Sequence, residues 1–328
     1  MVKRQLLYKE WKQSELTFIL VMLVAALATP FAFLMEYSSF QTCLNDTDCI
    51  TDAPRFSYIF KTDPFLSLSW LMGIFFAVMQ LGFERNKGQM DFTLSLPFSR
   101  STIYHTKFFL GAGIIAVAHA VSYVLTYLLI LGLNPLETPG FHNGYIISLV
   151  SSLMFYSLFF AAGTLTGSSI SQAIVGFSTA ILPFLVIGLP LVHVDFIIKT
   201  SGSWLDKSFA YLISPISPIN YIIDEPFRSD YPLWFSGEKI IIPIVMVVLF
   251  YLIGLISFIK HPIERNGRFF LYSSMDRPIQ IMVIVFGVLG FGWFGFSSDN
   301  SIFGYIVGML IGGVVGALTS YFLIYRKR

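Results

Sequence analysis

Eight stretches of apolar residues, each about the length of a membrane-spanning helix, follow one another along the chain. A helix needs about 20 residues to cross roughly 30 Å of hydrocarbon, because each residue adds about 1.5 Å. Polar and charged residues collect in the segments between these stretches. The pattern predicts eight spans, at Leu16–Met35, Phe65–Phe83, Phe108–Leu133, Tyr145–Leu165, Ala173–Val194, Ile240–Ile259, Ile279–Phe296 and Ile302–Ile324.

The composition supports a membrane protein. Of the 328 residues, 55% are hydrophobic, 17% are aromatic and 12% are charged, and the mean hydropathy is +0.72. Soluble domains are typically about one quarter charged. No repeat, low-complexity tract or break in composition marks a soluble domain. We therefore predict an all-α polytopic membrane protein with one membrane domain over residues 1–328, formed by a six-helix core at 1–260 and an additional helix pair at 261–328.

The distribution of charge predicts the orientation in the bilayer. Lys and Arg gather in the N-terminal segment, in the loops after the second and sixth spans and in the C-terminal tail, whereas most acidic residues fall in the other loops. Because cytoplasmic loops are enriched in Lys and Arg, both termini are predicted to be cytoplasmic.

In residues 1–15, Leu7 and Trp11 recur at helical spacing, which favours a helix in the headgroup region over an ordinary basic flank.

Both cysteines, Cys43 and Cys49, lie in the first outer loop. An oxidising outer compartment would allow them to form a disulfide, and two free thiols are the alternative.

The second outer loop, Asp195–Glu238, has apolar residues at helical spacing followed by several prolines. This pattern favours a short amphipathic or re-entrant helix pair over a plain surface loop.

The last apolar stretch carries a glycine at every fourth position, namely at Gly304, Gly308, Gly312 and Gly316. Such a stripe lets two helix backbones approach closely. We expect it to pack within the chain, against the glycines of the preceding stretch at Gly287, Gly290 and Gly295. An interface with another subunit is the alternative.

Several classes of function do not fit the sequence. There is no phosphate-binding loop of the type G-x-x-x-x-G-K-[ST], so we expect no ATP hydrolysis and no cofactor in this chain. Residues 138–194 contain no Asp, Glu, Lys or Arg, although ion-coupled carriers usually need such groups. We expect His119, which lies deep in a span, to be hydrogen-bonded to a neighbouring helix rather than to relay protons.

Enzymes and nucleic-acid-binding proteins fit poorly as well. No His or Cys cluster has the spacing of metal ligands, and no serine has a His or Asp nearby that could serve as a base. The basic residues lie at membrane boundaries rather than on a soluble surface, so nucleic acid is not an expected partner.

A charged loop at Phe83–Lys107 stands out between the second and third spans. Charged and apolar residues alternate in it, which predicts a short amphipathic helix at Glu84–Leu96. Pro97 ends this helix, and Ser99 or Ser101 can cap the next span, with Arg100 and Lys107 at its cytoplasmic end. A rigid helix joined to two spans can transmit a push to both of them. A loop that only sets the topology is the alternative.

The same loop resembles a motif of ABC-2 type permease subunits. Lys9–Trp11 resembles their membrane-entry helix, and Ser214–Ile222 resembles the segment before their sixth span. The resemblance covers residues 1–260, and the length and the additional span pair are similar to the YtrC/YtrD permeases of bacilli, which are linked to acetoin use. In the loop the resemblance is carried by Glu84, Arg85, Gly88, Leu94, Leu96, Pro97, Ser99, Arg100, Ile103 and Lys107.

This resemblance implies a permease subunit in the bacterial cell membrane. The helix at Glu84–Leu96 would be a coupling helix that seats in a groove of a separate ABC ATPase subunit, with Arg100 as its membrane-side anchor. ATP and Mg²⁺ would be bound by that ATPase. A second permease subunit would complete the pathway, and an extracytoplasmic binding subunit is a further partner that the family allows. Two features depart from the family: Gln89 stands where Thr is frequent, and the last two spans exceed the six-span core.

Two other functions fit the same residues. One is an ATP-independent channel or facilitator for small neutral solutes, which the uncharged spans would permit. The other is a non-transporting sensor or scaffold subunit whose outer loops bind a ligand. Of the three, only the permease requires an ATPase partner.

Overall fold

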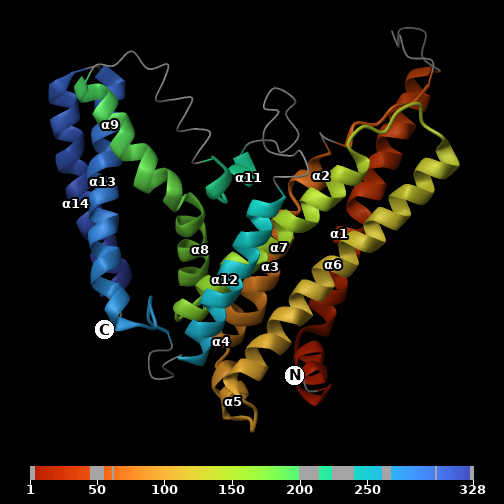
Figure 1. Cartoon of the computed structure of the whole chain (residues 1–328), viewed down its shortest axis with the longest axis horizontal. Helices are drawn as coiled ribbons and strands as arrows, with labels where there is room; N and C mark the ends of the chain where they lie inside the picture. Colours follow the sequence, from red (N-terminus) through yellow and green to blue (C-terminus); the bar gives the residue numbers. More distant parts are fainter. Residues whose placement is uncertain are drawn as a thin grey trace.

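The computed structural model describes residues 4–44, 55–60, 63–198, 214–223, 240–260, 267–299 and 301–325. Helices account for nearly all of these residues, and their β structure is limited to an isolated antiparallel bridge between Thr166 and Phe270. Figure 1 shows the long helices arranged as a bundle. The predicted all-α polytopic membrane fold is confirmed.

The long helices of the described residues are α1 (Arg4–Leu44), α6 (Arg100–Leu133), α7 (Phe141–Leu165), α8 (Ser169–Pro183), α12 (Ile241–Ile259), α13 (Asp276–Asp299) and α14 (Ile302–Ile324). Shorter elements connect them: α2 (Pro64–Ser67), α3 (Trp70–Ala77), η2 (Val78–Phe83), α4 (Glu84–Asn86), α5 (Gln89–Ser95), η3 (Phe184–Gly188), α9 (Leu189–Ile198), η4 (Ser214–Ile216), α11 (Asn220–Ile223) and η7 (Ser273–Met275).

Seven helices in the described part of the chain are long and apolar enough to cross a bilayer. They are α1, α6, α7, the continuous run from α8 into α9, α12, the run from η7 into α13, and α14. These correspond to seven of the eight predicted spans. The remaining predicted span, Phe65–Phe83, is helical but interrupted.

The interruptions lie where side chains form hydrogen bonds between this segment and other helices. A turn after α2 separates it from α3, and η2 at the end of α3 is a π-helix. Gln172 of α8 donates to the carbonyl oxygen of Ala77 at 3.0 Å, and Gln80 within η2 donates to the carbonyl oxygen of Lys107 at 3.1 Å. Hydrogen bonds to other helices thus accompany the wider helical turn, and π-helical turns of this kind are often found at functional sites.

Helix α7 is the most buried of the described candidate spans. It contacts α3, α6, α8 and α12 and is surrounded by protein along most of its length. Its buried aromatic side chains form the middle of the core, at Phe155, Tyr156, Phe159 and Phe160. Helices α3, α6, α8 and α12 therefore pack around α7.

Two sequence predictions concern regions that are only partly described. Cys43 lies in the last turn of α1, and Cys49 lies outside the described residues, so the disulfide stays a prediction. Most of Asp195–Glu238 also lies outside them. Its described part contains η4 and α11, and there the Ser217 hydroxyl donates to the carbonyl oxygen of Ala180 at 3.1 Å.

Helices α13 and α14 form a closely packed pair beside α9 (Figure 1). The glycine stripe of α14 faces α13: a Cβ atom at Gly308 would lie 2.2 Å from the carbonyl oxygen of Phe291, and one at Gly312 would lie 2.1 Å from that of Gly287. Gly304 and Gly316 approach the backbone of α13 in the same way. The stripe is therefore occupied by α13 within the chain.

Not every glycine predicted to take part does so. Gly287 and Gly295 of α13 lie against the backbone of α14, but a Cβ atom at Gly290 would meet nothing within 4 Å. Because the glycines of α14 recur at every fourth position, only the residues of α13 that face this stripe lie against the α14 backbone. Gly290 points away from that contact.

We predict that Gly308→Ala destabilises the protein by about 1–3 kcal/mol, because the new methyl group overlaps the α13 backbone. Gly290→Ala is the matched control. It should be neutral or stabilise by up to about 1 kcal/mol, because alanine favours helix and the site is open. Thermal unfolding of the purified variants measures both effects. Equal melting temperatures for the two variants would contradict this packing.

Candidate functional site

The segment between α3 and α6 lies at the same end of the molecule as both chain termini (Figure 1). It consists of α4, a turn at Lys87 and Gly88, α5, and an extended link to α6. Gly88 has a φ of 69°, a left-handed conformation that glycine adopts without strain. The predicted single helix at Glu84–Leu96 is therefore two short helices, since the glycine breaks the helical path between them.

The N-terminal part of α1 packs against this segment. The backbone at Ser14 is not helical, and this kink separates residues 4–13 from the long membrane-spanning part of α1. Leu6 is fully buried, and the side-chain amide of Gln13 donates to the side-chain oxygen of Gln89 at 2.6 Å. The first turns of the chain thus form one wall of the site.

Two lysines and two glutamates meet where α1, α4 and α6 converge. Lys107 of α6 is 1% exposed, and its ammonium nitrogen lies 2.5 Å from Glu10 Oε2 and 2.5 Å from Glu84 Oε2. Lys9 Nζ lies 3.0 Å from Glu10 Oε1 and 3.5 Å from Glu84 Oε1. We call these four residues the ion cluster. Its formal charges cancel.

Thr93 extends the ion cluster to α5. Its hydroxyl donates to Glu84 Oε1 at 2.7 Å and accepts from Lys9 Nζ at 2.7 Å. Helices α4 and α5 of the segment thus share one hydrogen-bonded network with α1 and α6. The position of α5 is tied to that of α6 through side chains as well as through the backbone.

Electrostatics keeps Glu84 ionised. Burial on its own would raise the pKa of the Glu84 carboxyl, but the charge and hydrogen bond of Lys107, helped by Thr93 and Lys9, outweigh burial and hold that pKa below its usual value. Buried charges are tolerated only when they are paired and hydrogen-bonded. The four charges of the ion cluster therefore depend on one another.

Arg85 joins the segment to the end of α7. Its guanidinium donates to the carbonyl oxygen of Gly163 at 2.7 Å and to that of Thr166. These carbonyl groups lie at the C-terminus of α7, where a cation is favoured by the unpaired C=O groups and the helix dipole. Burial lowers the pKa of Arg85 to about 10, which still leaves it charged at neutral pH.

Glu84 and Arg85, which were predicted to belong to the ATPase-coupling interface, are both buried. Glu84 pairs with Lys107, and Arg85 donates to the end of α7, so both hold the segment in place within the chain. Their part in a coupling interface stays a prediction.

The other residues predicted from the loop occupy distinct places. Leu94 and Leu96 are partly buried against the core, and Pro97 is exposed after α5. The Ser99 hydroxyl accepts from the Thr102 amide at 3.2 Å and caps α6, as predicted. Arg100 donates to the carbonyl oxygen of Ile259 at 3.1 Å, which connects the start of α6 with the end of α12.

The exposed face of α5 includes residues that were not predicted as part of the coupling interface. Phe92 is 62% exposed, and the side chains of Asp91 and Ser95 on α5 and of Lys87 before the Gly88 turn are exposed as well. An aromatic ring with charges of both signs around it is a typical centre for a protein contact. The amphipathic alternation in the sequence could have indicated this face, since Met90 and Thr93 lie on the opposite, buried side.

His119 is hydrogen-bonded as predicted. Its Nδ1 donates to the carbonyl oxygen of Ile115 at 2.9 Å, and its Nε2 lies 3.1 Å from the hydroxyl of Ser148 on α7. Among the described residues, no group of three or more His, Cys, Asp or Glu side chains could hold a metal ion.

Comparison with known proteins gives a consistent result. The model of the ABC-2 family transporter protein matches residues 14–261. The chain is similar to the probable ABC transporter permease YtrD of Bacillus subtilis (strain 168), with 40% identity over 322 residues, 98% of this chain and 97% of the relative. It is also similar to the probable ABC transporter permease YtrC of the same strain, with 42% identity over 336 residues, 100% of this chain and 99% of the relative. No solved structure matches.

We predict that Lys107→Met destabilises the protein by about 3–5 kcal/mol, because Glu10 and Glu84 then face each other with less compensating charge. Adding Glu84→Gln should recover part of the loss, since one buried negative charge is removed. Lys12→Met is the control: Lys12 makes an exposed ion pair with Glu15, and its loss should leave the melting temperature nearly unchanged. Thermal unfolding provides the measurement. Equal effects of Lys107→Met and Lys12→Met would contradict the ion cluster.

Proposed function

We propose that this chain, which belongs to the ABC-2 family of transporter proteins and is an ABC transporter permease subunit of the bacterial cell membrane, receives the work of ATP hydrolysis through residues 83–107. The observation that carries the proposal is that α5 has an exposed face and is joined, through Thr93, to a buried ion cluster. A surface that is pushed must be rigidly joined to the helices that move.

The partners follow from the family. An ABC permease works with ABC ATPase subunits and with a second permease subunit. In this proposal ATP and Mg²⁺ are bound by the ATPase, and residues 83–107 lie on the cytoplasmic side, in agreement with the distribution of Lys and Arg. An extracytoplasmic binding subunit stays a prediction from the sequence.

Phe92 is the centre of the proposed contact. Aromatic side chains often dominate the binding energy of protein interfaces, and surrounding charges set orientation and association rate. Asp91, the neighbour of Phe92 in the sequence, and Lys87, before the Gly88 turn, are exposed charges of opposite sign on the same short segment. The ATPase surface is therefore expected to offer an apolar pocket for Phe92 with polar groups at its rim.

Three connections would pass movement of α5 into the membrane. The ion cluster ties it to α1 and α6, Arg85 ties α4 to the end of α7, and Arg100 ties the start of α6 to α12. A nucleotide state of the ATPase that binds one arrangement of these helices more tightly than another would shift the permease toward that arrangement.

The resemblance to the YtrC/YtrD permeases implies acetoin, a small uncharged solute, as a candidate cargo. The absence of Asp, Glu, Lys and Arg from residues 138–194 supports an uncharged cargo. Proteoliposomes that contain the reconstituted permease and ATPase should show acetoin movement that depends on MgATP. Movement without ATP would favour the facilitator, and no movement in either condition would remove acetoin as cargo.

We predict that Phe92→Ala reduces both ATPase co-purification and permease-stimulated ATP hydrolysis by about tenfold or more, since truncating a central aromatic side chain commonly costs 2 kcal/mol or more. Phe303→Ala is the matched control, because Phe303 is 78% exposed on α14, far from α5 in the sequence. It should leave both measurements unchanged. Membrane insertion and melting temperature of Phe92→Ala should match the wild type, since its ring makes few contacts within the chain.

A variant at Glu84 would not test docking alone, because Glu84 is part of the ion cluster. Unchanged stimulation in a well-folded Phe92→Ala variant, and in Phe92→Asp as a stronger change, would overturn the proposed contact.

A further inference from the structure

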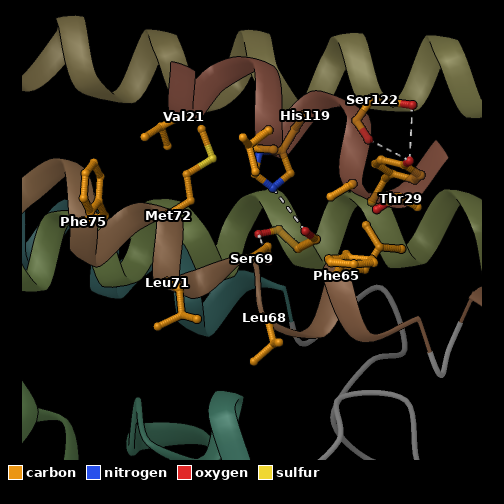
Figure 2. Close-up of a pocket in the computed structure, with 16 residues that line it drawn as sticks. Val21, Thr29, Phe65, Leu68, Ser69, Leu71, Met72, Phe75, His119 and Ser122 are labelled. Atoms are coloured by element: carbon orange, nitrogen blue, oxygen red, sulfur yellow. Dashed lines mark hydrogen bonds between the residues drawn. The ribbon is translucent and has the colours of Figure 1, made fainter. Parts of the chain in front are cut away.

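A cavity of about 300 Å³ lies between α1, the α2–α3 segment, α6 and α7, away from residues 83–107. Figure 2 shows Val21 and Thr29 of α1, Met72 and Phe75 of α3 and His119 of α6 around it. Ligand pockets usually span about 300–1,000 Å³, so this one is large enough for a small molecule or one aliphatic chain.

The wall of the cavity is almost entirely apolar. None of its lining residues is Asp, Glu, Lys or Arg. Transfer of a charged group into such a wall would be costly, because apolar side chains do not replace its hydration and no charged side chain pairs with it. The cavity therefore selects against ions and favours an uncharged ligand with a hydrocarbon body.

Exposed apolar side chains border the cavity. Leu68 and Leu71 line it and are about half exposed, and Val24 of α1 is exposed on the other side. Helices α1, α6 and α7 are candidate membrane spans. A ligand can thus reach the cavity from the bilayer without crossing a polar surface.

One part of the wall carries hydroxyl groups. Ser148 lies 3.1 Å from His119 Nε2, and the Tyr145 hydroxyl lies 3.0 Å from Ser122 Oγ and 2.8 Å from Thr126 Oγ1. Since His119 Nδ1 donates to the carbonyl oxygen of Ile115, Nε2 accepts the Ser148 proton. The hydroxyl protons are used in these internal bonds, but the hydroxyl oxygens keep lone pairs that can accept.

We propose that this cavity binds an uncharged amphiphile from the membrane, with an aliphatic chain along α1 and α3 and a hydroxyl group that donates to the Ser122, Tyr145 and Ser148 end. A long-chain alcohol is the simplest ligand of this class. Binding at this site does not require the ATPase, so the proposal stands or falls independently of the docking surface at Phe92.

The test uses the purified full chain in nanodiscs and a photoreactive alkanol with a diazirine on its chain. After irradiation, labelled peptides should come from the cavity-lining parts of α1, α3, α6 and α7. Unlabelled alkanol should compete, whereas an alkyl sulfate with the same chain should not, because its charge excludes it. Competition by the sulfate as strong as that by the alkanol would overturn the selection against charge.

A variant that fills the cavity gives a second measurement. Ala28→Trp should reduce labelling by about tenfold, since Ala28 lines the cavity and the indole ring would fill part of its volume of about 300 Å³. Leu27→Trp is the matched control, because Leu27 is the neighbouring residue of α1, is exposed and does not line the cavity. Equal labelling of the two variants, or labelled peptides confined to other helices in the wild type, would overturn the proposal. The wild-type map decides the question even if Ala28→Trp does not fold.

Discussion

The ammonium group of Lys107 fixes the arrangement on which the rest of this end of the molecule depends. It is buried between Glu10 and Glu84, and together with Lys9 it compensates the charges of both carboxylates. Each partner comes from a different segment of the chain. The ion cluster therefore sets how residues 4–13 and the helix pair α4–α5 meet the start of α6, and a single electrostatic requirement specifies a tertiary arrangement.

The charges are not needed for stability alone, because a protein with apolar residues of similar volume in place of a buried ion pair is often no less stable. What the charges add is specificity, because a shifted register would leave a carboxylate unpaired. Arg85 acts in the same way at the end of α7, where the carbonyl oxygens of Gly163 and Thr166 accept its protons. Such specific contacts suit a surface element that transmits force, because they fix its position relative to the helices that it moves.

The sequence predicted the elements that depend on local signals. The apolar stretches, the stop at Pro97 and the cap at Ser99 need only neighbouring residues, and the structure contains all of them. The interruptions of the predicted span at Phe65–Phe83 were missed, since they accompany contacts with distant side chains such as Gln172. The buried contacts of Glu84 were missed for the same reason: Glu10 and Lys107 are 97 residues apart, and no local pattern shows that they meet.

The cavity and the ion cluster share two helices. On α6, Lys107 and His119 are separated by about 18 Å along the axis at 1.5 Å per residue, and α1 contributes Glu10 to the cluster and Val21 and Thr29 to the cavity wall. Helices are stiff over such lengths, and α1 packs against α6. A displacement applied at the ion cluster can be absorbed at the kink at Ser14, or it can change the separation of α1 and α6 at the cavity. In the second case the cavity volume would vary with the state of the docking surface, which links ligand binding in the membrane to events at its edge.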